Sequence, residues 1–241
     1  MHYQLVIFLL LSSTFCSGQI GNDVSDTGKT PVDYINPLIG TAFEGFSAGL
    51  EGGGAAPFVN RPFAMTNFLA QTNQNKMGLM AYTYEQDRII GFLASHQPTV
   101  WMGDYGYVSI MPQIGAIEVL PERRGLHFRH EDEVSKPHYY SVIMQSGTER
   151  IRGEIAGASR AAEFRFTFPA KTVRRIIIQG INVDSSLNDP INDYQTRLNT
   201  LEGYVWVDPV NRRIVGFNPD RQSAQLGPPL ENFRGYFVLQ F

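Results

Sequence analysis

The chain has 241 residues, and its 20 Lys and Arg against 23 Asp and Glu give a formal net charge of −3. The charges are spread without long runs of one sign, which argues against nucleic acid or an anionic membrane as a partner. Cys16 is the sole cysteine, so the chain after it can form neither a disulfide nor a thiolate metal site. A domain of this size has a core large enough to do without either.

The first residues are typical of an export signal. Leu5 to Leu11 form a short apolar run, and small residues lie just before Gln19. The run is too short to span a bilayer, which takes about 20 residues. We therefore interpret residues 1–18 as a secretory signal peptide, with the protein secreted. Residues 19–31 are polar and predict a flexible leader, and residues 32–241 are expected to form one domain.

The rest of the chain alternates short strand patterns with turn residues. Strands are expected at 82–84, 88–92, 108–112, 116–120, 139–144, 149–155, 163–168, 174–179, 204–207, 213–217 and 236–241. Residues 85–87 and 208–211 are expected to turn hairpins, 222–229 to form a loop, and a short helix to begin at Asp189 and stop at Gly203. With almost no helical periodicity, the pattern predicts an all-β antiparallel sandwich.

The segment from Phe128 to Glu133 places three acidic residues next to His130. A metal site is one interpretation of this composition. The acidic residues are consecutive, so their side chains point in different directions. A charged, solvated connection between strands is therefore the favoured interpretation.

Residues 91–106, which read GFLASHQPTVWMGDYG, form a long polar and aromatic loop after a strand pattern. Loops of this kind commonly carry binding sites. His96 and Gln97 can donate and accept hydrogen bonds, Trp101 offers a flat apolar face, and Asp104 offers a carboxylate. From the loop alone, a structural role is slightly favoured, with Trp101 in the core and Asp104 capping a turn.

A glycine-rich segment at residues 45–54 ends in Gly52, Gly53 and Gly54. It lacks the Lys-Ser/Thr of a phosphate-binding loop, and no helical pattern follows it. A flexible loop is favoured over a phosphate site. A third interpretation is a backbone that passes close to a ligand.

Several short motifs carry a family resemblance. They are Asn36–Thr41, Pro62–Met65, Tyr82–Tyr84, Ile89–Phe92, His96, Gly103–Gly106, Phe128–Glu133 and Pro137–Val142. In this order and spacing they resemble glycoside hydrolase family 92 over nearly everything after residue 31. Members of that family are secreted, calcium-dependent exo-α-mannosidases with an N-terminal β-sandwich, of the galactose-mutarotase-like supersandwich type, and a following (α/α)-barrel. This chain resembles the sandwich alone.

The resemblance implies a binding role without catalysis. The family's general acid, general base and most calcium ligands lie in the barrel, and no residue here matches them, so no catalytic or metal-binding residue is assigned. Calcium is expected only with the full-length family. The implied partners are mannose-containing glycans and a barrel domain absent from this chain. Two departures, Ala64 where the family has Gly and Gln97-Pro98 where a second His is common, leave the sugar preference open.

The resemblance also implies roles for the loop residues. Trp101 would stack on a sugar face, while His96 and Asp104 would bind hydroxyls, with Gln97 and the backbone of 52–54 nearby. These side chains are expected to converge at one edge of the sandwich and to stay at least partly exposed. A stand-alone carbohydrate-binding module and an inactive truncated product are the alternatives.

The last expected strand, Tyr236–Phe241, is apolar and has no turn after it in this sequence. An uncovered strand of this kind tends to pair with other chains. The sequence therefore predicts an exposed or incompletely covered edge here.

Overall fold

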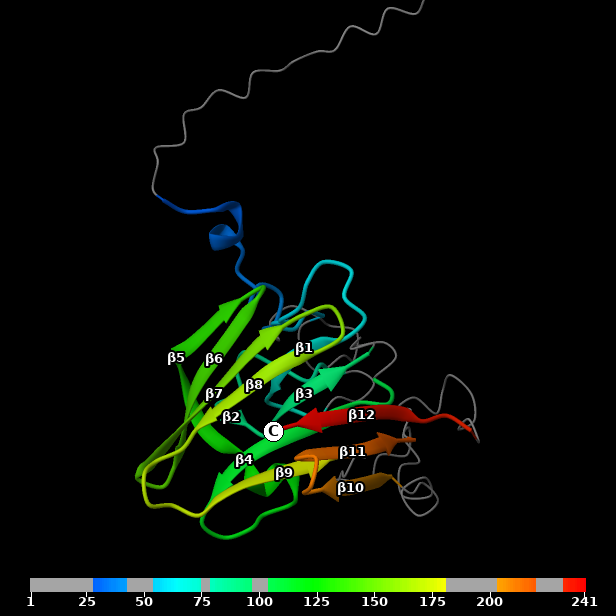
Figure 1. The fold of residues 1–241 in the computed structure, drawn as a ribbon. Coiled ribbons are helices and arrows are strands. Elements are labelled where there is room, and N and C mark those ends of the chain that lie inside the picture. Colours follow the sequence, from blue (N-terminus) through cyan, green and yellow to red (C-terminus); the bar gives the residue numbers. More distant parts are fainter. Residues whose placement is uncertain (1–27, 43–53, 75–78, 97–103, 181–202, 220–231) are drawn as a thin grey trace, which may run out of the picture.

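A computed structural model describes residues 28–42, 54–74, 79–96, 104–180, 203–219 and 232–241, which form three antiparallel sheets (Figure 1). The four-stranded sheet has the order β1 (Asn67–Gln71), β3 (Gly91–Ser95), β4 (Val108–Ile114) and β9 (Arg174–Gln179). The five-stranded sheet has the order β2 (Arg88–Ile89), β5 (Leu126–Lys136), β6 (Tyr139–Ser146), β7 (Glu149–Gly157) and β8 (Ala162–Thr167). The three-stranded sheet has the order β10 (Tyr204–Asp208), β11 (Arg213–Asn218) and β12 (Gly235–Gln240). Of two single-turn helices, η1 (Pro31–Tyr34) precedes the first strand and α1 (Pro121–Arg124) connects β4 with β5.

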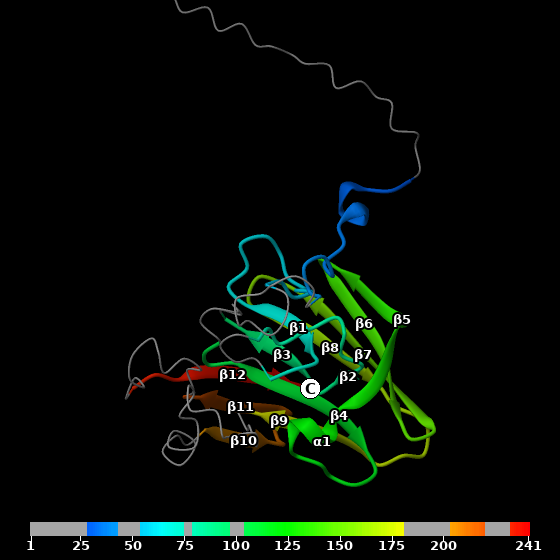
Figure 2. The ribbon, with the colours of Figure 1, turned by 180° about the vertical axis from the view of Figure 1, so that it is seen from behind.

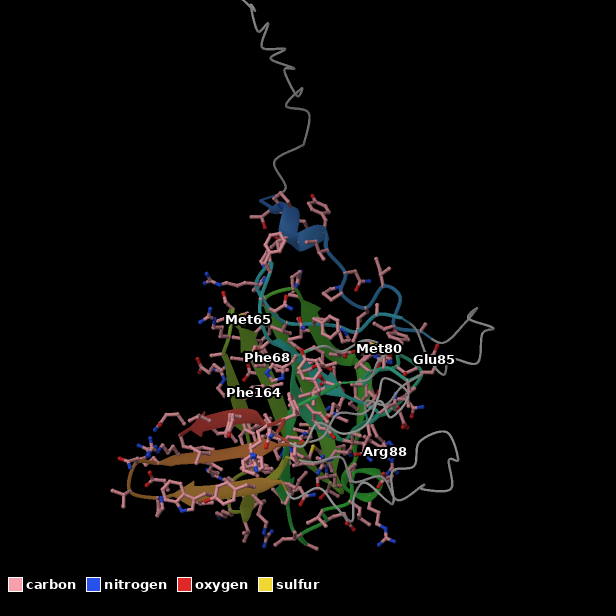
Figure 3. The ribbon with its side chains drawn as sticks, turned by 90° about the vertical axis from the view of Figure 1, so that its right-hand side faces the viewer. Met65, Phe68, Met80, Glu85, Arg88 and Phe164 are labelled. Atoms are coloured by element: carbon pink, nitrogen blue, oxygen red, sulfur yellow. The ribbon has the colours of Figure 1, made fainter. Side chains whose placement is uncertain are left out.

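The four-stranded and five-stranded sheets pack face to face around the main core. Phe68 of β1 meets Phe164 of β8 edge to face, with ring centroids 5.9 Å apart (Figure 3). Phe92 of β3 meets Phe166 in the same way at 5.1 Å. The ring of Phe92 also fills the place where a side chain at Gly153 of β7 would lie. The predicted all-β antiparallel sandwich is confirmed.

The four-stranded sheet is covered on its other face as well. Leu69 and Leu93 alternate along β1 and β3 with the residues of the main core, and both are fully buried. They pack with Met80 and Tyr82, which come from the irregular segment before β2. Because both faces are buried, these strands are apolar on both sides.

The three-stranded sheet continues the fold beside β9, on the side away from β5 and β6 (Figure 2). Its first two strands form the hairpin that the sequence predicts, with a turn at residues 209–212. β12 adds to β11, from Arg213 opposite Gln240 to Asn218 opposite Gly235. The strands at 108–114, 139–146, 149–157, 162–167 and 174–179 are also confirmed.

Four expectations from the sequence are wrong. Residues 85–87 turn no hairpin, because no strand immediately precedes them and β2 pairs with β5. Residues 82–84 form no strand. Their strand-like pattern arises because Tyr82 packs its buried ring against the four-stranded sheet. Residues 116–120 form no strand, because the chain leaves β4 at Gly115, where φ is +78°. Residues 128–133 are no solvated connection but lie within β5, where a bulge shifts the register between Phe128 and Glu133.

Other predicted segments fall outside the described residues. They are the signal peptide, most of the leader, the helix from Asp189 and the loop at 222–229. Within the described ranges, no helix is long and apolar enough to cross a membrane.

Candidate functional site

The candidate site begins where β3 ends and β4 starts, at the two described ends of the loop 91–106. The Asp104 carboxylate lies between these ends. Its Oδ1 accepts the backbone N–H of His96 at 3.3 Å and that of Tyr105 at 2.8 Å. Asp104 therefore closes the base of the loop with a single oxygen atom, as Asp side chains do in turns.

Aromatic packing holds the same two ends together. The His96 ring stacks on Tyr105 with centroids 5.6 Å apart, and His96 Nδ1 lies 3.2 Å from the Tyr105 carbonyl oxygen. Tyr105 in turn meets Phe233, just before β12, edge to face at 5.7 Å. The end of the loop is thus attached to the three-stranded sheet.

Two glycines bring the backbones of these segments into direct contact. A Cβ at Gly106 would lie 2.7 Å from the Cα of Gly235, and Gly106 also has a φ of +59°. Only glycine meets both conditions without strain. Next to this contact, the buried Asn218 side chain donates to the Tyr107 carbonyl at 2.9 Å. The loop base is consequently a fixed structure.

The structure agrees with part of the predicted site. It brings His96 and Asp104 together, and His96 is exposed as expected. The expectation that Asp104 stays partly exposed is wrong, because its side chain is buried while it bonds to the loop backbone. Gly54 is exposed and lies by the turn at Gly40, whose carbonyl accepts the N–H of Ala55 at 3.2 Å.

Gln97, Trp101, Gly52 and Gly53 lie outside the described residues. Their assignment to the site stays a prediction, as does the sugar-binding role of His96, Asp104 and Gly54.

His96 also lines a hollow of about 790 Å³ between β8 and β12. This volume lies within the range of ordinary ligand sites. Its walls are mainly phenylalanine and aliphatic side chains, with polar groups such as His96, Arg160 and Glu163 among them. The hollow was not predicted from the sequence, because it arises from how two separate sheets lie side by side.

A buried polar cluster around Glu133 was also not predicted from the sequence. It joins β5, β6 and the segment before β2. The Glu133 side chain is 1% exposed. It accepts the hydroxyls of Tyr82 at 2.9 Å and Tyr140 at 2.6 Å, and His130 Nδ1 lies 2.7 Å from its Oε2. Burial first, and the neighbouring Glu133 charge second, raise the pKa of both tyrosines. The hydroxyls therefore keep their protons and remain donors.

His130 connects this cluster to the segment before β2. Its Nε2 lies 2.7 Å from the Tyr84 carbonyl oxygen, and its ring stacks on the Tyr84 ring at 3.8 Å. The bulge in β5 turns the Glu133 side chain inward. A run of consecutive acidic residues in the sequence does not reveal where a bulge lies. Within the described residues, no group of three or more His, Cys, Asp or Glu side chains could hold a metal.

An antiparallel sandwich in which the two ends of the loop between β3 and β4 are held together defines a fold class rather than one protein. Comparison with known proteins identifies the family. Residues 34–241 match the model of the glycosyl hydrolase family 92 N-terminal domain, and the chain belongs to that family.

Solved structures of similar proteins agree with this assignment. An inverting mannosidase of family 92 from Bacteroides thetaiotaomicron is 29% identical with a TM-score of 0.67, over 88% of this chain and 25% of that one. An α-mannosidase of the same family and organism is 20% identical with a TM-score of 0.57, over 77% and 23%, and shows the same fold. The chain thus spans about a quarter of the length of these mannosidases. No match was found among curated proteins.

Proposed function

We propose that this chain is the sugar-lining N-terminal domain of a secreted, calcium-dependent α-mannosidase that acts on the N-glycans of glycoproteins. The observation that carries the proposal is the match of residues 34–241 to the family's N-terminal domain. In this proposal the loop after β3 contributes to the wall of the mannose subsite. Trp101 stacks on the sugar, and His96 and Gln97 bind its hydroxyls.

The loop base supports this role. A sugar-binding loop discriminates best when its ends are held rigidly, because little order is then lost on binding. Asp104, with its two backbone hydrogen bonds, and the Gly106–Gly235 contact supply such a base. Asp104 acts here as a positioning residue, because its hydrogen bond to the His96 backbone N–H fixes the point from which the imidazole extends.

The proposed role does not include catalysis by this chain. An inverting glycosidase uses two carboxyl groups about 6.5–9.5 Å apart across the scissile bond. Asp104 is buried with its Oδ1 on backbone N–H groups, which does not fit the part of an exposed acid or base. The general acid and base are proposed to come from a further barrel domain. The described residues likewise offer no cluster suited to calcium.

An exposed patch near the loop before β1 fits contact with such a domain. Phe63 is fully exposed and has a φ of +59°, a conformation that bulky residues rarely adopt. Met65 beside it is also exposed, and its N–H donates to the Ser159 carbonyl at 2.8 Å (Figure 3). Exposed apolar side chains that lie together are typical of interaction surfaces.

The test compares the two tryptophans of the chain. Binding of α-mannobiose is measured by calorimetry for the parent, Trp101→Ala and Trp206→Ala, with Trp206 as the matched control on β10. Trp101→Ala should weaken binding by roughly 1 kcal/mol, about fivefold in Kd, and Trp206→Ala should leave it unchanged. Equal binding by all three proteins contradicts the proposed subsite.

A mannosidase assay accompanies the binding measurement. The chain is incubated with an aryl α-mannoside and calcium, and no turnover is expected. Turnover that exceeds that of an Asp104→Asn control would show that the chain carries its own catalytic groups. Binding without turnover, in a protein that functions alone, would instead favour the stand-alone carbohydrate-binding module. A folded chain that neither binds nor hydrolyses would favour the inactive product.

A further inference from the structure

The hollow between β8 and β12 has the shape of a missing strand. Its floor is one face of the four-stranded sheet, where Ala94 stands opposite both Phe68 and Val108 in the two strand registers. One wall is β8 and the other is β12, and the packing of Phe164 and Leu239 against the same core places both strands over this floor. We call this hollow the strand groove.

Both walls of the strand groove are sheet edges. In the described part of the chain, β8 pairs only with β7, and β12 pairs only with β11. The second edge of each strand carries backbone N–H and C=O groups that can pair with another strand. An apolar floor between two such edges suits an extended segment with an apolar residue at every second position.

We propose that the strand groove accepts a β-strand that follows Phe241 in a longer polypeptide and runs back antiparallel to β12. Phe241 itself lines the groove, and its N–H donates to the Arg212 carbonyl at 2.9 Å. Because this N–H faces β11, a tight turn that begins one residue after Phe241 would lead into the groove. The chain matches the N-terminal domain of its family and covers about a quarter of the similar mannosidases, so the relatives have further residues after this domain.

Other occupants fit the groove less well. A second copy of the chain would insert its β12, which is already paired with its own β11. That β11 would have to lie where β8 forms the opposite wall of the groove. A sugar would need hydrogen-bond partners along the floor, where Phe68, Val108 and Ile110 offer none. A strand satisfies the two edges and the apolar floor at once. This inference is independent of the proposed sugar binding.

The test adds a designed strand to the full chain. The matched extension is Thr-Asn-Gly followed by Thr-Val-Lys-Val-Thr-Val, since Asn-Gly favours a two-residue hairpin turn and the residue after Phe241 is the one whose N–H faces the groove. In this register the valines lie opposite Phe241, Leu239 and Phe237, on the face of β12 that carries Leu239 into the core. The control extension, Thr-Asn-Gly followed by Val-Thr-Val-Lys-Val-Thr, has the same composition and is shifted by one residue. This shift turns every valine to the opposite face.

The matched extension should raise the Tm by at least about 2–4 °C, the shift that corresponds to 1 kcal/mol in a domain of this size. It should also slow hydrogen exchange at the β12 amides that do not bond to β11. The control extension should do neither. Ala94→Phe, which fills the floor, should remove the gain of the matched extension.

Three results overturn the proposal. The first is an equal Tm for the matched and control extensions. The second is precipitation of the matched protein while the control stays soluble. The third is a stable dimer of the unextended chain with its β12 amides already protected, which would make a second copy the occupant. None of these results depends on mannose, so a failure here is distinct from a failure of the proposed function.

Discussion

The five-stranded and three-stranded sheets differ in how completely this chain covers them. In the five-stranded sheet, inward residues such as Ile151 and Ile155 are fully buried, and the inward Glu133 has three polar partners. In the three-stranded sheet, Trp206 and Val238 remain about half exposed or more. The first sheet is stabilised by contacts within the chain, whereas the second presents apolar surface that another segment could cover.

The same contrast separates the two polar sites. The Glu133 side chain lies in the covered part and is almost completely buried, so its role is to stabilise the fold. His96 lies where the four-stranded sheet opens toward β12, at the end of the strand groove. A ligand can reach only the second kind of position. The incompletely covered half of the domain is therefore where function is expected.

The largest expected effect tests the covered half. Glu133→Ala removes the contact with His130 and leaves the buried hydroxyls of Tyr82 and Tyr140 without their acceptor. Leaving the two buried hydroxyls without an acceptor should cost about 1–3 kcal/mol of unfolding free energy for each hydroxyl. Urea denaturation measures it, with the exposed neighbour Glu131→Ala as a control that should change stability by less than about 0.5 kcal/mol. A similar small loss in both variants would show that the cluster is not a stabilising centre.

The next effect tests the boundary between the two halves. Arg124 of α1 is buried, and it donates to the Ile90 carbonyl at 2.7 Å and to Gln179 Oε1 at 2.6 Å. Burial lowers the pKa of its guanidinium to about 10, so it remains charged at neutral pH. Arg124→Ala leaves both acceptors buried and should cost about 2–3 kcal/mol. Arg123→Ala, on the exposed side of α1, is the matched control in thermal unfolding and should change little.

Much of the fold could be predicted from the sequence, because alternation reports burial directly. The Phe164–Phe166 pattern of β8 and the hairpin of β10 and β11 were predicted for this reason. The failures come from longer-range effects. Tyr82 is buried by a contact with β5 rather than by a strand of its own, and the inward turn of Glu133 depends on a bulge.

The candidate site could be predicted only in part. The polar and aromatic composition of the loop pointed to His96 and Asp104, and the structure brings them together. Sequence could not show that Asp104 is buried at the loop base, because the same residue type serves ligands and turns equally well. The strand groove involves β8 and β12, about 70 residues apart in sequence, and no local pattern encodes their distance in space.

A smaller, pH-dependent effect concerns the outer face of the five-stranded sheet. Arg165 donates two hydrogen bonds to Glu154, both at 2.7 Å, and these bonds lower the pKa of Glu154 to about 2 from a usual value of 4.5. The folded protein thus binds this proton less readily than the unfolded chain. The stabilisation is complete above about pH 5 and is lost as the pH falls toward 2.

The size of this effect is limited by solvent. Two-thirds of the Arg165 side chain is exposed, so screening should keep the contribution near 1 kcal/mol. Denaturation of the parent and Glu154→Gln at pH 7 and pH 3 measures it. The difference between the two proteins should shrink at pH 3, and a difference that stays constant would mean that the pair does not titrate in this range.

The smallest effect on stability concerns the open half, where a substitution should change association instead. Val238 of β12 is 65% exposed, on the face that also carries Tyr236. Val238→Lys places a charge on this exposed apolar face, which discourages contact with other chains through the face. Unfolding free energy should change by less than about 0.5 kcal/mol, because little packing is lost. Light scattering at high concentration should show self-association of the parent and a monomeric variant.

Val142→Lys in the covered sheet, where Val142 is fully buried, should instead unfold the domain. If the parent is already a monodisperse monomer, the exposed face of the three-stranded sheet does not cause association.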